Sequence, residues 1–284
     1  MQAVVTDSTW SLPATLAEQW GITVVPLHVI GPDAQWLDGG EHVDLEAGRL
    51  TTSQPSTHEL EAALVAAGAA ADGLVCVHLS GELSGTAAAM SRAAEQYRAR
   101  SGLPVTVIDA RTVGAALGFS AAVAAATLAS GGAATLAVAR ARETAARSRV
   151  VFTVAELRHL QRGGRLSAPR AMIGAALGIR PVLEIREGAI RLREPVRGAA
   201  RARSALAAAV TEGLPPGPVS LAVHHVGAQD AADELAEQLR QAAKARGASV
   251  ERVEVTPMSA VLAVHAGPGA LAAVSAPTFG LLGA

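Results

Sequence analysis

The sequence predicts an α/β protein whose first half forms a mostly parallel sheet covered by helices on both faces. Short runs rich in β-branched residues alternate with longer helical patterns there, and such alternation is typical of βαβ units. The 284 residues exceed the usual size of a single core, so two domains are expected. Because the pattern changes in kind near residue 150, we place the domains at 1–150 and 151–284.

The first block contains four expected strands and five expected helices. The strands are the apolar runs at residues 3–6, 22–30, 73–80 and 105–109. The helices are expected at about 12–20, directly after 52–56, and at about 84–100, 113–130 and 134–147. The most apolar stretch, 114–138, is rich in Ala and Gly and is broken by polar residues and a glycine pair, so it predicts buried helices and not a membrane span.

The second block is predicted to combine a hairpin with alternating helices and strands. The hairpin covers 181–194, with its turn at Glu187–Gly188. A strand and a short helix precede it from residue 150. After it we expect a helix at about 198–212, a strand at 219–226, a helix at 229–246, a strand at 249–255 and an apolar helix after Gly269.

The composition limits the classes of partner. With 24 basic and 25 acidic residues and no long basic block, the chain lacks the clustered positive charge that nucleic acid requires, and we expect at most transient membrane contact. The single cysteine, Cys76, lies in an apolar run and excludes a disulfide framework. Since the first residues also lack the pattern of a secretory signal, we expect a cytoplasmic protein.

Hydroxyl and carboxylate side chains follow several of the expected strands. In a parallel sheet, ligands bind outside the carboxyl ends of the strands. The residues at these positions are Asp7, Ser8, Ser84, Gly85 and Asp109, and the segment TSQPS at 52–56 precedes a helix in the same way. Each turn alone is explained by helix capping. Together they favour an anion site, because hydroxyls and free N–H groups gather at helix N-termini.

The second block adds two candidates. Arg165 follows paired glycines in LQRGGRLS, a loop able to swing a guanidinium over a cleft, although a turn with a solvated arginine explains it equally well. His265 stands directly before Gly267-Pro268-Gly269; a structural histidine is the alternative. His224 and His225 lie within a strand pattern, and we expect them to be structural.

Several common catalytic patterns are missing from the sequence. It contains no GxxxxGK[ST], no GxGxxG after the first strand, no HExxH and no GxSxG, and no Cys/His cluster with zinc spacing. We therefore expect no metal and no cofactor.

The polar segments, taken in order along the chain, resemble the DegV family. The resemblance spans nearly the whole sequence and rests on Asp7–Ser8, VPL at 25–27, TSQPS at 52–56, LSGT at 83–86, Asp109, LQRGGRLS at 160–167, IRPVL at 179–183 and HAGPG at 265–269. It implies an α/β/α sandwich with a parallel sheet, followed by a two-layer α/β domain with a mixed sheet. It also implies a long-chain fatty acid bound between the domains.

The resemblance further implies a role as the fatty-acid-binding subunit of a bacterial fatty acid kinase. A separate ATP-dependent kinase subunit then phosphorylates the bound acid to an acyl phosphate, so this chain is a carrier without catalytic residues of its own. The residues implied around the carboxylate are Thr52, Ser53, Ser84, Gly85 and His265. Those implied near the head group or the partner are Arg165, Asp7 and Ser8. The small residues of 171–181 are a candidate path for the tail.

Two alternatives stay open at this point. The first is an acyl hydrolase or transferase with Ser84 as nucleophile, His265 as base, and Asp7 or Asp109 orienting the base. The second is a fatty acid carrier or sensor that is not coupled to a kinase.

Overall fold

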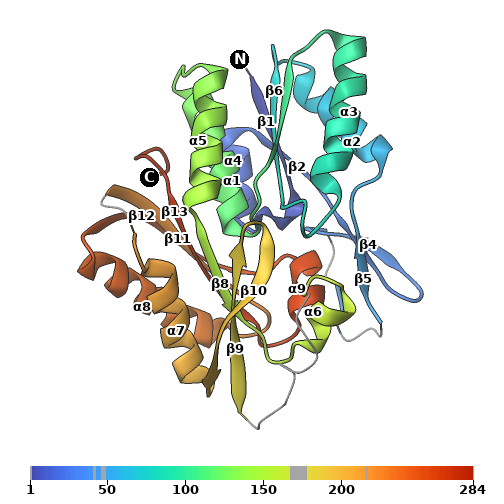
Figure 1. Ribbon diagram of the computed structural model, residues 1–284. Helices are drawn as coiled ribbons and strands as arrows, with labels where there is room; N and C mark the ends of the chain where they lie inside the picture. Colours follow the sequence, from blue (N-terminus) through green and yellow to red (C-terminus); the bar gives the residue numbers. More distant parts are fainter. Residues whose placement is uncertain (1, 41–42, 46–48, 167–177, 215–216, 284) are drawn as a thin grey trace.

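The first block contains a four-stranded parallel sheet. The computed structural model describes residues 2–40, 43–45, 49–166, 178–214 and 217–283. In this described part, the first sheet has the order β2-β1-β6-β7, and each neighbouring pair is parallel. Its strands are β1 (Ala3–Asp7), β2 (Ile22–Val25), β6 (Leu74–His78) and β7 (Val105–Asp109). Figure 1 shows this sheet with helices on both sides.

Alternating side chains of the strands explain the layers. Val4 and Val75 pack into the core on the side of α1 (Ala14–Trp20), α4 (Ala115–Ala129) and α5 (Ala134–Arg147). Val5 and Cys76, one position along, face α2 (Thr57–Gly68) and α3 (Thr86–Ser101). The sheet is therefore covered on both faces, as expected. No helix in the described residues has the length and apolar character needed to cross a membrane.

The second block contains a six-stranded mixed sheet with the order β10-β9-β8-β13-β11-β12. Only the β11–β12 pair is parallel. Its strands are β8 (Arg149–Thr153), β9 (Ile179–Arg186), β10 (Ala189–Arg197), β11 (Gly217–His225), β12 (Ala248–Pro257) and β13 (Leu271–Pro277). The hairpin turn at Glu187–Gly188 is confirmed, with φ angles of 54° and 84°.

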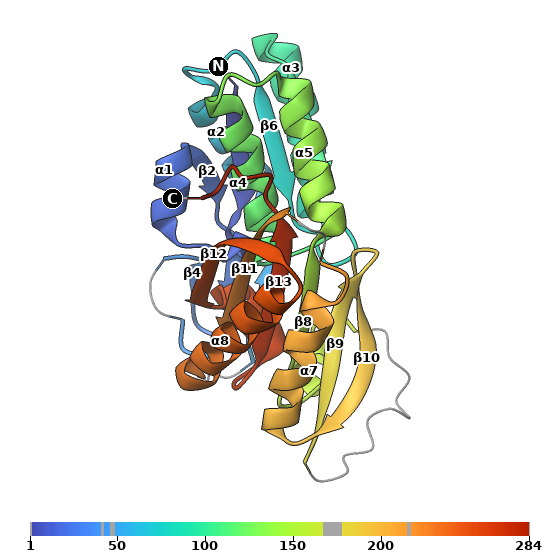
Figure 2. The same ribbon diagram turned by 90° about the vertical axis from the view of Figure 1, so that its left-hand side faces the viewer.

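Helices cover the mixed sheet differently on its two faces. Figure 2 shows α7 (Ala199–Thr211) and α8 (Gln229–Ala245) side by side on one face. On the other face, α6 (Arg158–Arg162) and α9 (Ala260–Ala266) pack over Phe152 and Leu183. The predicted α/β fold, with one parallel and one mixed sheet, is therefore confirmed.

Helix α4 is common to the cores of both blocks. Every residue from Ala115 to Leu128 is buried. The helix packs on β1 and β6 and also contacts β13, and its core cluster includes Val150, Ala222 and Val274 of the second sheet. Small alanine side chains allow this close approach to two sheets. A domain boundary near residue 150 stays a prediction.

A third, small sheet differs from what the sequence predicts. It has the order β4-β3-β5, with β3 at His28–Ile30, β4 at Gln35–Leu37 and β5 at Thr51–Ser53. The expected single strand over 22–30 is wrong, because the run is divided between β2 and β3, which belong to different sheets. Pro26 lies at the break, and a proline cannot donate to a strand ladder.

The apolar helix expected after Gly269 is also wrong. This segment is β13, which lies between β8 and β11 in the mixed sheet. All of its residues are buried. A strand buried on both faces shows no polar alternation, and its alanines resemble a helical pattern.

Candidate functional site

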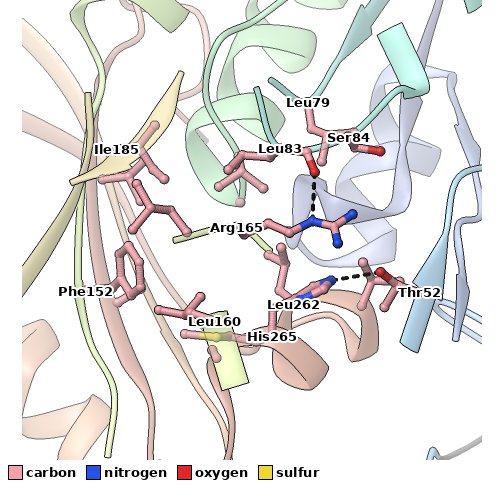
Figure 3. A pocket seen from close by; sticks show the side chains of 18 of the residues that line it. Thr52, Leu79, Leu83, Ser84, Phe152, Leu160, Arg165, Ile185, Leu262 and His265 are labelled. Atoms are coloured by element: carbon pink, nitrogen blue, oxygen red, sulfur yellow. Dashed lines mark hydrogen bonds between the residues drawn. The ribbon is translucent and has the colours of Figure 1, made fainter. Parts of the chain in front are cut away.

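Five of the side chains singled out in the sequence line one pocket between the two blocks. Thr52 and Ser53 come from β5, Ser84 from the turn before α3, Arg165 from the loop after α6, and His265 from α9. Their segments lie far apart in the chain. The fold brings them together because β5 and the α3 turn of the first block face α6 and α9 of the second, as Figure 3 shows at close range.

The central contact joins Thr52 and His265. The threonine Oγ1 lies 2.8 Å from the imidazole Nε2, within hydrogen-bonding distance. Gly163 passes close behind the ring, since a Cβ placed on Gly163 would lie 2.3 Å from His265 Nδ1. A side chain at 163 would therefore displace the imidazole from its position beside Thr52.

His265 is neutral at physiological pH. Burial lowers the pKa of His265 to about 4, and the positive charge of Arg165 adds to this effect. A neutral imidazole has one donor and one acceptor nitrogen. It can therefore hold a hydrogen bond to a bound carboxylate without adding a full positive charge.

Arg165 is anchored across the pocket between the two blocks. Its Nε donates to the carbonyl of Leu83 over 3.1 Å, and its Nη1 donates to the carbonyl of Gly163. The side chain is thus held at both ends of its guanidinium, in contrast to the swinging arginine expected from the sequence. Since arginine has five N–H donors, the guanidinium keeps donors for a ligand.

Ser84 and Gly85 lie at the N-terminus of α3 but have different roles. Ser84 lines the pocket, and its Oγ lies 2.9 Å from the Oγ1 of Thr86. Gly85 does not line the pocket; a Cβ there would lie 2.4 Å from Oε1 of Gln54. Gln54 is a pocket residue that sequence reasoning did not single out, although it stands within TSQPS.

Asp7 and Ser8 lie outside the pocket lining. Asp7 is fully buried, and its Oδ2 accepts a hydrogen bond from Leu79 N over 2.9 Å and lies 3.0 Å from His78 Nδ1. Ser8 donates to Asp38 over 2.7 Å. Asp7 thus joins the ends of the neighbouring strands β1 and β6, and Ser8 joins the end of β1 to the residue after β4. A role toward a partner stays a prediction for both.

The residues proposed for an acyl-transfer triad are not assembled as one. Ser84 is hydrogen-bonded to Thr86, and His265 is hydrogen-bonded to Thr52. Asp109 accepts hydrogen bonds from the backbone N–H groups of Arg111, in its own turn, and of Gly81, in the turn after β6. Among the described residues, Ser84 therefore has no base in hydrogen-bonding contact.

Apart from His224, the remaining walls of the pocket are apolar. Figure 3 shows Phe152 and Ile185 on the side opposite Thr52. The cavity measures about 110 Å³, far more than the roughly 10 Å³ that one water needs. The apolar lining residues are Leu27, Leu79, Leu83, Val113, Val150, Phe152, Leu160, Ile185, Ile190, Met258, Val261, Leu262, Ala266 and Ala272. Of the tail path expected at 171–181, residues 171–177 lie outside the described residues.

His224 closes another part of the pocket in a structural role, as expected. Ala115 N, at the start of α4, donates to its Nε2 over 3.0 Å. Its Nδ1 therefore carries the hydrogen and donates to Thr256 Oγ1 over 2.8 Å. Burial lowers the pKa of His224 to about 4, so the ring is neutral.

The site suits an amphiphile with a small anionic head. Hydroxyls, a neutral imidazole and an arginine converge at one side of a cavity whose other walls are mostly aliphatic or aromatic hydrocarbon side chains. In the described part of the chain, no three His, Cys, Asp or Glu side chains are placed to hold a metal ion together. The groups present are hydrogen-bond donors, which bind an anion.

Comparisons with known proteins identify the family. The family model described as "Uncharacterised protein, DegV family" matches residues 1–278. A DegV domain-containing protein of Streptomyces coelicolor is 38% identical over 280 residues, which cover 96% of this chain and 97% of that protein.

Two solved structures share the fold over almost their whole length. The structure described as fatty acid binding of a DegV family protein from Thermus thermophilus has a TM-score of 0.86 at 30% identity, covering 97% of this chain and 99% of that one. DegV of Bacillus subtilis, described as a fatty acid binding protein, has a TM-score of 0.81 at 29% identity, covering 97% and 98%. With the family model matching nearly every residue, this chain belongs to the DegV family.

Proposed function

We propose that the protein is a cytoplasmic carrier that binds a long-chain fatty acid and presents its carboxylate to a separate ATP-dependent kinase subunit. One observation supports this above all: Thr52, Ser53, Ser84, Arg165 and His265 converge at one side of a cavity whose other walls are mostly apolar. The carboxylate would lie among these five side chains, and the tail would lie along the apolar walls.

The energetics of this arrangement suit a fatty acid. Burying the tail contributes on the order of 0.8 kcal/mol per methylene, so the apolar walls would supply most of the affinity. A carboxylate taken out of water needs compensating donors. Thr52, Ser84 and neutral His265 supply them without the bidentate clamp that would engage both carboxylate oxygens.

A carboxylate held by such donors keeps an oxygen available for phosphoryl transfer. That oxygen attacks the γ-phosphorus of ATP, the bond to the β–γ bridging oxygen breaks, and ADP leaves with that electron pair. The sequence has no GxxxxGK[ST] loop, which agrees with ATP being bound by another subunit.

The relatives support the ligand class. The proteins of Thermus thermophilus and Bacillus subtilis described as binding fatty acids are 30% and 29% identical to this chain over nearly its full length. We infer the same ligand class for this chain, since its pocket provides both an apolar and a polar end.

Extraction of the purified protein tests the ligand. The denatured protein is extracted with organic solvent and the extract is analysed by mass spectrometry; long-chain fatty acids in a ratio near one per chain are expected. Delipidated protein should then take up a fluorescent fatty acid. An extract without fatty acid together with no uptake would overturn the proposal.

Reconstitution tests the kinase coupling separately. Loaded protein is mixed with a kinase subunit from the same organism and ATP, and acyl phosphate is measured after trapping with hydroxylamine. Formation of acyl phosphate that requires both proteins supports the proposal. Fatty acid uptake without any acyl phosphate would instead favour a carrier or sensor that is not coupled to a kinase.

A further inference from the structure

A second cleft lies on the other side of the Thr52–His265 pair. It is formed by Leu45 and residues 49–52, helix α6 with the loop after it, and helix α9 with the turn after it, and measures about 140 Å³. Its charged or titratable lining residues are Arg49, His159, Arg162, Arg165 and His265, and no acidic side chain of the described residues lines it. We refer to it as the cationic cleft.

The charges within the cationic cleft are not neutralised by neighbouring acids in the described residues. Arg162 Nη2 lies 3.3 Å from His159 Nδ1, and no ion pair is formed by Arg49 or Arg162 within the described part of the chain. The nearby Glu156 is paired with Arg158. The pKa of His159 is lowered, first by burial and then by the charges of Arg162 and Arg158, while the charge of Glu156 acts in the opposite direction.

The cationic cleft and the fatty acid pocket share a wall. Thr52, Arg165 and His265 line both. A group attached to a carboxylate that is bound at this wall would therefore lie in the cationic cleft while the carboxylate stays in the pocket. Gly267 and His159 are tightly packed at the edge of the cleft, because a Cβ on Gly267 would lie 2.7 Å from the ring of His159.

We propose that the cationic cleft is a phosphate subsite, which holds the phosphoryl group of an acyl phosphate while the acyl chain stays in the apolar pocket. This inference rests on the proposed function and deepens it, since it assigns a place to the group that the kinase adds. Arg49 and Arg162 are the residues assigned to the phosphate alone, and Arg165 serves both head groups.

The chemistry of the lining matches that group. The phosphoryl group of an acyl phosphate, like that of a phosphate monoester, carries about two negative charges near pH 7 and three acceptor oxygens. Arginine presents a planar fork of donors that fits phosphate oxygens in pairs. A carboxylate has a single charge and two oxygens, so three arginines around one head group exceed what a fatty acid needs and suit the phosphorylated product.

A competition experiment tests the subsite. Delipidated protein is loaded with a fluorescent fatty acid, which is displaced by either palmitate or hexadecyl phosphate, a stable amphiphile with the same number of carbon atoms and a phosphate head. We expect hexadecyl phosphate to bind at least about tenfold more tightly than palmitate at low salt, with a preference that declines as salt is added.

The double variant Arg49→Gln/Arg162→Gln should lose this preference while its affinity for palmitate stays within about twofold of the wild type. The control is Arg142→Gln/Arg246→Gln, which removes the same charge from two exposed arginines outside both cavities and should keep the preference.

Each other outcome overturns the inference. If the wild type bound palmitate but did not prefer hexadecyl phosphate, the subsite would be refuted and the proposed function would stay intact. The same conclusion would follow if the double variant kept the preference. If the control variant lost the preference for hexadecyl phosphate to the same extent, the preference would result from the overall charge of the protein and not from the cleft. If the wild type bound neither amphiphile, the proposed function would be refuted as well.

Discussion

Thr52 and His265 stand 213 positions apart in the chain, yet Oγ1 of the threonine lies 2.8 Å from Nε2 of the histidine. The pair joins the small sheet of the first block to α9 of the second. It also forms the wall between an apolar pocket and a cationic cleft. A group bound at this pair therefore has an apolar environment on one side and positive charge on the other.

Replacing Thr52 should weaken fatty acid binding. Thr52→Val keeps the shape of the side chain but removes its hydroxyl, which costs about 1 kcal/mol, or roughly a fivefold loss of affinity. Fluorescent displacement measures the effect. Thr51→Val is the matched control on the same strand, since Thr51 is exposed and lies outside the apolar pocket. Equal affinities for the two variants would exclude Thr52 from the head-group site.

Gly163→Ala should displace the imidazole of His265. The added Cβ would lie 2.3 Å from Nδ1, so the ring must move, at a cost of about 1–3 kcal/mol in the free energy of unfolding. Urea unfolding and fatty acid uptake should both decline. Gly283→Ala is the control, because its Cβ would meet only Glu251 Oε1, at 3.7 Å. Unchanged unfolding and uptake in Gly163→Ala would show that the ring position is not required.

Stability should decrease as the pH falls below about 6.5. Burial holds the pKa of His224 and of His265 at about 4, below the ordinary 6.5, so protons bind the unfolded chain more tightly than the folded one. Each histidine then contributes a loss of up to about 1.4 kcal/mol per pH unit between these two values, and its contribution is fully present above 6.5.

Urea unfolding of the ligand-free protein at pH 7 and pH 5 measures this slope. His265→Gln should flatten it, and replacement of the exposed His58 by Gln should leave it unchanged. A slope that is the same in His265→Gln and the wild type would contradict the assignment.

Arg165→Gln should affect phosphorylation more than binding. The guanidinium lines both the apolar pocket and the cationic cleft, so its loss removes charge at the subsite proposed for the phosphoryl group. We expect acyl phosphate formation with the kinase subunit to decline by about tenfold or more, and fatty acid affinity to decline less. Equal losses would place Arg165 in direct contact with the carboxylate alone.

Ser84 should not become acylated. Its Oγ is hydrogen-bonded to Thr86, and His265 is hydrogen-bonded to Thr52, so no base of the described residues contacts the serine. Incubation with an activated acyl ester followed by intact-mass measurement should show no added acyl group, while Ser84→Ala still weakens fatty acid retention. An acyl adduct that is absent from Ser84→Ala would support the hydrolase or transferase alternative.

The sequence was informative where local chemistry determines the role of a residue. Paired glycines before Arg165 and a glycine turn after His265 are visible in the sequence, and both side chains lie in the pocket. Asp7 could not be placed in this way: a carboxylate after a strand can face a ligand or a neighbouring backbone, and only the pairing of β1 with β6 directs it to Leu79 N.

The same limit explains the remaining differences. Gln54 lines the pocket because β5 pairs with β3, a short and polar pairing without a periodic signal. The alanines of β13 have a strand conformation because two antiparallel neighbours surround them, which no local pattern indicates. The predictions from sequence were wrong mainly where long-range strand pairing, and not local secondary-structure propensity, determines the structure.

The burial of α4 against both sheets restricts how a ligand can enter. A hinge motion that separates the two blocks would remove this helix from one of the sheets and expose its alanines to water. We therefore expect lipid exchange to proceed by local parting of the segments around the pocket mouth. Loading and unloading would leave the joint between the blocks closed throughout the cycle.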